Sequence, residues 1–276
     1  MNNRIINIGF SPCPNDTFIF EAMVNGKIDT GSFRFEPVLE DVQTLNEWAL
    51  QNKLPVTKLS YGVLPLVTGA YDLLSSGSAL GRGAGPLLIS DGKFNGAVED
   101  ATIAIPGAHT TAHFLFSNAY PQAKHKVFMR YDEIESFVQS GKGLGVIIHE
   151  NRFTYQQKGL QLIQDLGVVW ENTTGLPIPL GGIVIRKSMP IEIKRAVNDC
   201  IRRSIAYAYA QMPEISEMVR AHAQEMEEDV MRAHISLYVN AFTENLGEQG
   251  IQAVRAFEKI AQQHQPGDTQ PVTIIQ

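Results

Sequence analysis

The sequence has little that would mark a secreted, zinc-binding or nucleic-acid-binding protein. Among its 276 residues are two cysteines, Cys13 and Cys200, which are too few for a disulfide framework or a cysteine-rich zinc site. The 23 lysine and arginine residues against 29 aspartate and glutamate residues give a net charge of −6, and the basic residues form no run. Because a phosphate-backbone binder needs clustered positive charge, we expect no nucleic-acid partner.

Long apolar runs are also missing. No stretch approaches the roughly 18 apolar residues of a membrane span. The N-terminal segment is interrupted by Asn7, Pro12 and Pro14, so it does not resemble the apolar region of a signal peptide. We therefore expect a soluble, cytoplasmic protein with no membrane partner. A content of 44% hydrophobic residues is that of a folded chain, because a chain this apolar offsets its ordering entropy by burial.

Short apolar runs alternate with amphipathic segments over the first two thirds of the chain. Strands are predicted at 4–10, 33–39, 56–59, 71–74, 86–90, 101–105, 126–130, 143–148 and 180–186. After residue 190 the pattern is almost entirely helical, with helices predicted at 190–211, 213–224, 228–240 and 247–263 before a polar tail. Strands that alternate with helices predict an α/β protein whose parallel or mixed sheet has helices on both faces.

The uneven distribution of these elements predicts two lobes. The first strands have few helices near them in sequence, whereas the last helices have no sheet of their own, so we expect those helices to return to the first sheet. This gives a larger α/β lobe of residues 1–90 plus 187–276 and a smaller inserted α/β lobe of residues 91–186. The topology is that of a two-lobe type II periplasmic-binding-protein-like fold with a ligand cleft between the lobes. The two crossings would run side by side near 90–92 and 186–187.

Polar residues follow several predicted strands, at the sheet edge where open α/β folds bind ligands. Asn15, Ser60 and Ser78 can hydrogen-bond the hydroxyl groups of a ligand. Asn15 and Asp16 are equally consistent with capping the helix that follows them. Five such polar clusters at five strand ends predict a cleft for a polar small molecule.

The pair Thr110-Thr111 stands at a predicted strand–turn–helix junction. A helix start offers free N–H groups and a favourable dipole to a carboxylate or phosphate, and the two hydroxyls add donors. The alternative is an ordinary threonine N-cap. We favour ligand contact, because one threonine suffices for a cap.

His149 is the best candidate for chemistry. It ends the apolar run 144–148, which should deliver its side chain to the cleft, and histidine titrates near neutral pH and serves as a general base. The alternative is a partly buried histidine that bonds a backbone carbonyl. His109 and His113 have the spacing of a metal pair, but Thr110 stands where the metalloprotease motif needs glutamate, so we predict no metal site.

Several segments together resemble the 1,4-dihydroxy-6-naphthoate synthase family of the futalosine route to menaquinone. They are GFSPCPNDTFIFEAMVNGKID, KLSYG, SSGSALGRGAGPLLIS, GAHTTAHFLF, GVIIHENRFTY and HISLYVNAFTENLGEQG. The resemblance extends over nearly the whole chain, and SPCPNDTF together with IIHENRFTY is fairly specific. It implies a cofactor-free carbon–carbon lyase that converts cyclic dehypoxanthine futalosine, a carboxylate, to 1,4-dihydroxy-6-naphthoate.

The resemblance also implies particular site residues. The general base of the family falls on His149, and its substrate contacts fall on Lys58, Leu59 and Ser60 and on Thr110 and Thr111. The rival interpretations are a non-catalytic small-molecule binding protein, or another lyase or dehydratase, on the same two-lobe fold. A binding protein needs no histidine at its cleft, whereas an enzyme of this type does.

Overall fold

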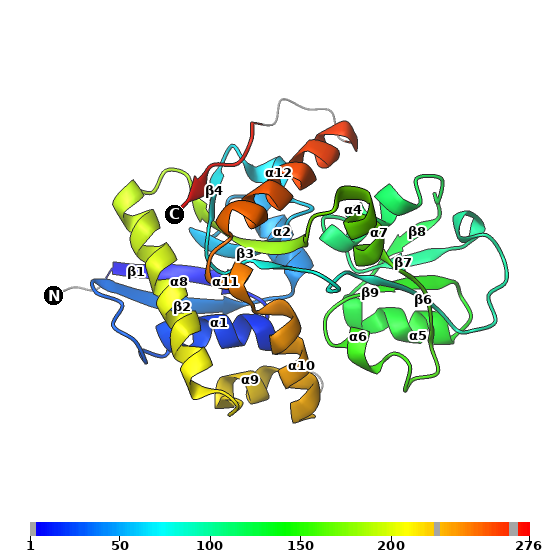
Figure 1. Ribbon diagram of the computed structural model, residues 1–276, viewed down its shortest axis with the longest axis horizontal. Coiled ribbons are helices and arrows are strands. Elements are labelled where there is room, and N and C mark those ends of the chain that lie inside the picture. Colours follow the sequence, from blue (N-terminus) through cyan, green and yellow to red (C-terminus); the bar gives the residue numbers. More distant parts are fainter. Residues whose placement is uncertain (1–3, 224–226, 265–269) are drawn as a thin grey trace.

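The strands of the chain form two sheets (Figure 1). The computed structural model describes residues 4–223, 227–264 and 270–276. Within these residues the first sheet has seven strands in the order β12-β4-β11-β3-β1-β2, with β5 beside β11, and the second has five in the order β10-β6-β9-β7-β8. The first contains β1 (Arg4–Phe10), β2 (Phe33–Leu39), β3 (Val56–Ser60), β4 (Tyr71–Leu74), β5 (Ala79–Gly81), β11 (Ile178–Arg186) and β12 (Ile274–Ile275). The second contains β6 (Leu87–Ser90), β7 (Ile103–Ile105), β8 (Lys126–Phe128), β9 (Leu144–Ile147) and β10 (Gln161–Asp165).

Helices pack on both sheets. Those before residue 100 are α1 (Pro14–Val24), α2 (Val42–Leu50), α3 (Leu64–Val67) and the 3₁₀ turn η1 (Val98–Asp100). The middle of the chain has α4 (Thr111–Ala119), η2 (Tyr131–Glu133), α5 (Ile134–Gln139), α6 (Asn151–Thr154) and α7 (Leu166–Thr174). The last part has α8 (Ile191–Gln211), α9 (Glu217–His222), α10 (Glu228–Tyr238), α11 (Ala241–Glu244) and α12 (Gly247–His264). None of these helices is both long and apolar enough to cross a membrane.

The C-terminal helices pack around the first sheet. Helix α8 lies against α1, where the Ser204 hydroxyl donates to the Ile19 carbonyl at 2.6 Å. Helix α12 packs on β11 and α3. In Figure 1 these helices, yellow to red, surround the blue strands, while the green second sheet with α5 and α6 forms the other lobe. Because a sheet face buries its apolar side chains only under another layer, the late helices complete the first lobe.

Capping side chains begin two of the helices that border the cleft, α2 and α4. Asp41 accepts a hydrogen bond from the Gln43 N–H and so caps α2. Thr110 accepts from the His113 N–H and caps α4. Each cap satisfies an N–H group that has no partner within its helix, which fixes where the helix starts.

The chain crosses between the sheets twice, and the two crossings lie side by side. The first joins β5 to β6 and the second joins α7 to β11. Strands β5 and β11 pair antiparallel, with Gly81 opposite Ile178, and the Arg82 guanidinium donates to the Gly175 carbonyl at 2.8 Å. The connection between the lobes is therefore a short two-stranded segment.

These crossings differ from the predicted boundaries. Strand β6 pairs with β9 and β10, so residues 87–90 lie in the second sheet, whereas 178–186 lie in the first because β11 pairs with β3 and β4. Both crossings therefore precede the predicted points at 90–92 and 186–187. The reason is that a fully buried apolar run has the same pattern in either sheet, so its pairing partners cannot be read from periodicity.

The predicted polar tail contains a strand. Ile274–Ile275 form β12, which pairs parallel to β4 at the edge of the first sheet, and Val272 is buried. The Val272 N–H donates to Glu258 of α12 at 2.8 Å. Residues 265–269 of the tail, and Gln224 at the end of a predicted helix, lie outside the described residues. A strand of two residues has no periodicity of its own, which is why the sequence pattern missed it.

Gly62 provides a test of how tightly the lobes are packed. A Cβ at this position would lie 2.6 Å from the Thr110 carbonyl oxygen and 2.9 Å from the Thr111 nitrogen, both of them backbone atoms. Because backbone yields less easily than a side chain, Gly62→Ala should lower the free energy of unfolding by about 1–3 kcal/mol, measured by denaturant titration. The control is Gly69→Ala, where an added Cβ meets nothing within 4 Å. Equal stability of the two variants would contradict the close packing.

Candidate functional site

A cleft lies between the two sheets. Like most small-molecule sites, its wall is mainly apolar with a few placed polar groups. The lining residues come from both lobes and from the crossings: Ser11, Asn15, Asp16, Val42, Lys58, Leu59, Ser60, Ala79, Ala84, Pro86, Thr110, Thr111, Ala112, Ile148, His149, Leu180, Gly181, His234 and Tyr238.

The cleft brings together eight of the nine residues singled out in the sequence. They are Asn15, Asp16, Lys58, Leu59, Ser60, Thr110, Thr111 and His149. Ser78 is the exception, because it is absent from the lining and fully buried. Its hydroxyl lies 2.9 Å from the Tyr61 hydroxyl, so its polar group is used in the interior. The expectation that Ser78 contacts a ligand is corrected accordingly.

Asp16 is the centre of a buried hydrogen-bond network at the start of α1. One of its oxygens accepts from the Ser11 N–H and hydroxyl, at 3.1 and 2.7 Å. The other accepts from Asn15 at 2.8 Å and from the Lys58 ammonium at 2.6 Å. Asp16 is 2% exposed and Lys58 is 5% exposed. Because a buried carboxylate needs both charge compensation and hydrogen bonds, this network fixes the loop before α1 against β3.

His234 joins this network from α10. Its Nε2 lies 2.9 Å from the Asn15 side-chain oxygen, and its Nδ1 has no hydrogen-bond partner in the described part of the chain. Burial lowers the pKa of His234 well below its usual value, and His149 and Lys58 lower it further. The neutral ring therefore donates from Nε2 to Asn15 and leaves Nδ1 unprotonated. His234 lines the cleft although its position within the predicted helix 228–240 gives no sign of a ligand contact.

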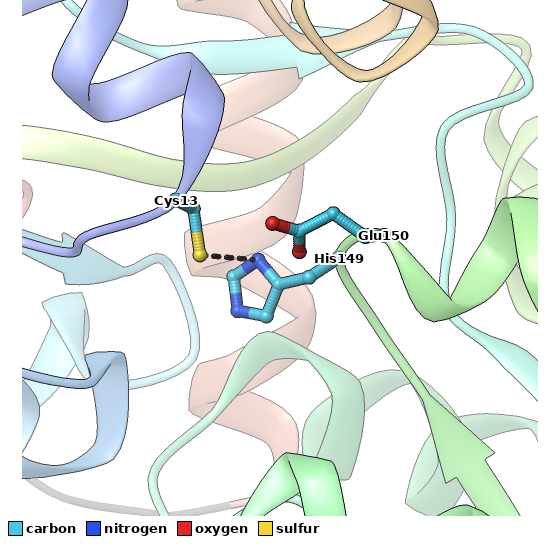
Figure 2. A group of neighbouring side chains, drawn as sticks. All are labelled: Cys13, His149 and Glu150. Atoms are coloured by element: carbon cyan, nitrogen blue, oxygen red, sulfur yellow. Dashed lines mark hydrogen bonds between the residues drawn. The ribbon is translucent and has the colours of Figure 1, made fainter. Parts of the chain in front are cut away.

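His149 lies across the cleft from α1, beside Cys13. The Cys13 sulfur is 3.4 Å from His149 Nδ1 (Figure 2). The Tyr131 ring contacts the imidazole edge-on, with centroids 5.0 Å apart. The backbone of His149 has φ = 57°, in the left-handed region that few non-glycine residues adopt. Such a conformation is retained where the surrounding structure determines it, and it is common at functional sites.

Burial also sets the protonation states around His149. It lowers the pKa of His149 to about 4. The negative charges of Asp16 and Asp41 raise this pKa, and the positive charge of Lys58 lowers it, but burial is the largest effect. Burial raises the pKa of the Cys13 thiol, and the negative charge of Glu150 raises it further. At neutral pH His149 is therefore an uncharged imidazole beside an uncharged thiol. This arrangement suits a histidine that accepts a proton and disfavours Cys13 as a nucleophile.

The hydroxyls of Thr110 and Thr111 are used within the protein. Thr110 donates to the Gly107 carbonyl at 2.9 Å, and Thr111 donates to the Leu180 carbonyl at 2.6 Å. Neither hydroxyl proton is left for an anion, which corrects the expected donors. The N–H groups of the first turn of α4 still point toward its N-terminal end, so an anion would meet backbone amides there.

Asn46 connects Ser60 to the second lobe. Its side-chain oxygen accepts from the Ser60 N–H at 2.8 Å, and its amide nitrogen donates to the Ser60 hydroxyl and to the His109 carbonyl, both at 3.0 Å. Asn46 is fully buried. It therefore ties a cleft-lining serine of β3 to the loop that leads into α4.

Most of the lining residues that the sequence did not predict are apolar, or lie far along the chain from the predicted ones. The missed lining residues are Ser11, Val42, Ala79, Ala84, Pro86, Ala112, Ile148, Leu180, Gly181, His234 and Tyr238. Small apolar residues carry no chemical signal in a sequence. A signal for His234 and Tyr238 did exist, since both lie in the segment HISLYVNAF that carries part of the family resemblance.

Two α/β lobes joined by paired crossings around a cleft define a periplasmic-binding-protein-like fold. Solved structures agree. The alkanesulfonate-binding protein of Xanthomonas axonopodis pv. citri superposes with a TM-score of 0.73 at 13% identity, covering 99% of each chain. A crystal structure of a protein from Archaeoglobus fulgidus superposes with a TM-score of 0.89 at 30% identity, covering 94% of this chain and 97% of the other.

Comparison of sequences identifies the family within this fold. A family model described as "Menaquinone biosynthesis" matches residues 6–263. The 1,4-dihydroxy-6-naphthoate synthases of Thermus thermophilus and Streptomyces coelicolor are 50% and 40% identical to it. The matches cover 90% and 92% of this chain and 91% and 92% of those proteins. The chain belongs to the 1,4-dihydroxy-6-naphthoate synthase family, the lyases of menaquinone biosynthesis, and the resemblance found in its sequence is confirmed.

Removing one partner of the buried Lys58–Asp16 pair should strongly destabilise the fold. Asp16→Asn leaves the Lys58 ammonium buried without a counter-charge, which typically costs 3–5 kcal/mol, so we expect a loss of about that size in the free energy of unfolding. Asp16→Asn/Lys58→Met, which removes both charges, should recover part of it. The control is Glu36→Gln in the exposed Arg34–Glu36 pair, where about 1 kcal/mol or less is expected. Equal losses at Asp16 and Glu36 would contradict this role.

The lowered pKa of His149 predicts a pH dependence of stability. The unfolded chain binds a proton at this histidine near pH 6.5, but the folded chain does so only near pH 4. The contribution of neutral His149 to the free energy of unfolding is therefore complete above pH 6.5. It is lost as the pH falls toward 4, and the loss is at most about 3 kcal/mol. His149→Asn should flatten this part of the stability curve. A folded-state NMR titration of His149 near pH 6.5 would contradict the prediction.

Proposed function

We propose that the chain converts cyclic dehypoxanthine futalosine to 1,4-dihydroxy-6-naphthoate without a cofactor, with His149 as the general base. The observation that carries the proposal is a neutral histidine held at the wall of a two-lobe cleft, in a chain of this family. The cytoplasmic location expected from the sequence stays a prediction.

The direction of the hydrogen bond between His149 and Cys13 determines whether Nε2 of His149 can accept a proton. With the ring proton on Nδ1 and directed at the Cys13 sulfur, the lone pair of Nε2 is available to accept a proton. With the thiol donating instead, Nε2 would carry the ring proton and could not act as a base. The proposed mechanism therefore uses the first tautomer, in which Cys13 is a positioning residue.

The cleft fits the two ends of the proposed substrate. Ala79, Ala84, Pro86 and Leu180 contribute to an apolar wall for the ring system. We place the carboxylate at the start of α4, where the backbone amides and the helix dipole favour an anion. The Lys58 ammonium, which can donate three hydrogen bonds and gives one of them to Asp16, faces the oxygens of the sugar-derived part.

The reaction needs a base and exclusion of water more than it needs electron transfer. Removing a proton next to a carbonyl and breaking a carbon–carbon bond moves electron pairs and leaves the overall oxidation state of the system unchanged. The base contributes typically 10²–10⁴ in rate, and closure of the lobes around the substrate would protect carbanion-like intermediates from solvent. This is why we propose no metal, nucleotide or flavin.

The test is product formation by purified protein supplied with cyclic dehypoxanthine futalosine. Wild type should release 1,4-dihydroxy-6-naphthoate, and His149→Asn, which cannot take up the proton, should turn over about 10²–10⁴ times more slowly. Substrate binding should change little, because the base acts mainly in the transition state.

The control is His113→Asn, which replaces a histidine that does not line the cleft and should leave turnover nearly unchanged. Near-wild-type turnover of His149→Asn would remove His149 from the mechanism. Absence of product from the wild type, with the substrate bound unaltered, would favour a binding protein.

A further inference from the structure

Three potential metal ligands meet at the contact between the lobes. Cys13 comes from the loop before α1 in the first lobe, whereas His149 and Glu150 follow β9 in the second. The thiol sulfur, a ring nitrogen and a carboxylate oxygen all lie within 4.8 Å of one another. Figure 2 shows the three groups directed toward one another. Residues far apart in the sequence thus form one compact donor set.

The donor set has the chemistry of a zinc site. Thiolate sulfur, imidazole nitrogen and carboxylate oxygen are the three ligand types that Zn²⁺ takes in proteins, and three protein ligands leave a fourth position for water. The thiolate and the carboxylate together neutralise the charge of a divalent ion, which lowers the cost of burying it. In the Nε2–H tautomer of His149, the lone pair of Nδ1 lies on the side of the Cys13 sulfur and is available to the ion.

A buried, unpaired atom lies next to the same carboxylate. His234 Nδ1 is 3.9 Å from Glu150 Oε2, its side chain is fully buried, and it has no hydrogen-bond partner among the residues described. Buried polar atoms without partners are uncommon in folded proteins and often mark the position of a water or an ion. This observation is independent of the Cys13–His149 contact and points to the same place.

We propose that Cys13, His149 and Glu150 form a zinc-binding site whose occupation inhibits the enzyme. Binding forms a Zn–S bond and breaks the S–H bond of Cys13, whose proton passes to solvent, so no oxidant or reductant is involved. The ion takes the lone pair of His149 Nδ1 and leaves the ring proton on Nε2. In the proposed function Nε2 is the atom that accepts the proton, so the zinc-bound enzyme has no base. Only this inhibitory effect, and not zinc binding itself, rests on the proposed function.

The binding test uses Zn²⁺ alone and tag-free protein. In competition with a chromophoric chelator, wild type should bind one equivalent of zinc per chain. Cys13→Ser should weaken zinc binding by more than about 100-fold, and Glu150→Gln should weaken it by at least about 10-fold. Even changes in residues that only contact the metal ligands typically cost 10–100-fold in metal affinity. His113→Asn, which alters the His109/His113 pair, should bind like wild type.

Cobalt provides a readout that does not depend on the stability of the Cys13 variant. Co²⁺ in this site should give thiolate-to-metal charge-transfer absorption in the near ultraviolet. The chain has two cysteines, so an unchanged band in Cys200→Ser assigns the sulfur to Cys13. Absence of the band from wild type, its loss in Cys200→Ser, or full zinc affinity in Cys13→Ser would each overturn the site.

Inhibition is measured separately from binding. One equivalent of Zn²⁺ should abolish most product formation, and excess chelator should restore it to the level of untreated protein. Zinc bound through Cys13 with turnover unchanged would overturn the inhibitory role. The proposed function fails by a different result, the absence of product from metal-free wild type, so the two failures are distinguishable.

Discussion

The buried ion pair between Asp16 and Lys58 is the interaction on which the site depends. It joins the first turn of α1 to β3 in the middle of the first sheet, and the same carboxylate also accepts hydrogen bonds from Ser11, in the loop before α1, and from Asn15. Through Asn15 the network reaches His234 on α10. Through the loop itself it positions Cys13 against His149 of the other lobe. A neutral side chain in place of Asp16 would leave this loop with an unpaired ammonium and no common acceptor.

The two-lobe architecture explains how one chain gathers these groups. Strands of both sheets, such as β1 and β3 in one and β9 in the other, end at the cleft, so side chains that follow them in the two lobes face the same space. The lobes are held in this arrangement by contacts that use backbone acceptors, such as Thr111 to Leu180 and Asn46 to His109. The same fold serves binding proteins that do no chemistry, since fold alone does not determine function. What this chain adds is a histidine whose environment keeps it neutral.

The sequence predicted the alternation of strands and helices and most polar residues of the cleft, because both depend on local patterns. His149 could be placed because an apolar strand ends just before it, and Thr110 because a turn precedes a helix. Ser78 was misplaced because a serine that follows a strand looks the same whether it faces a ligand or the Tyr61 hydroxyl. The lobe boundaries were displaced because the pairing of β6 and β11 is a non-local property. His234 reaches the cleft from more than 200 residues away, and only tertiary structure brings it to Asn15.

In the proposed mechanism, the environment of His149 makes it a weaker base but keeps its ring unprotonated at neutral pH. Burial lowers its pKa to about 4, so the conjugate acid is strong and the base is weaker than a histidine in water. The same burial keeps the ring unprotonated throughout the neutral range, so it is ready to accept a proton in the proposed reaction. A weak base needs an accurate approach to its substrate, and the ring is constrained from three directions: by Tyr131 at its edge, by Cys13 at Nδ1 and by a left-handed backbone conformation. The contact at Nδ1 also creates a set of potential metal ligands. A thiol and a carboxylate next to an unprotonated imidazole are the ligand types that Zn²⁺ binds. The proposed positioning of the base and the proposed binding of zinc therefore have the same structural origin.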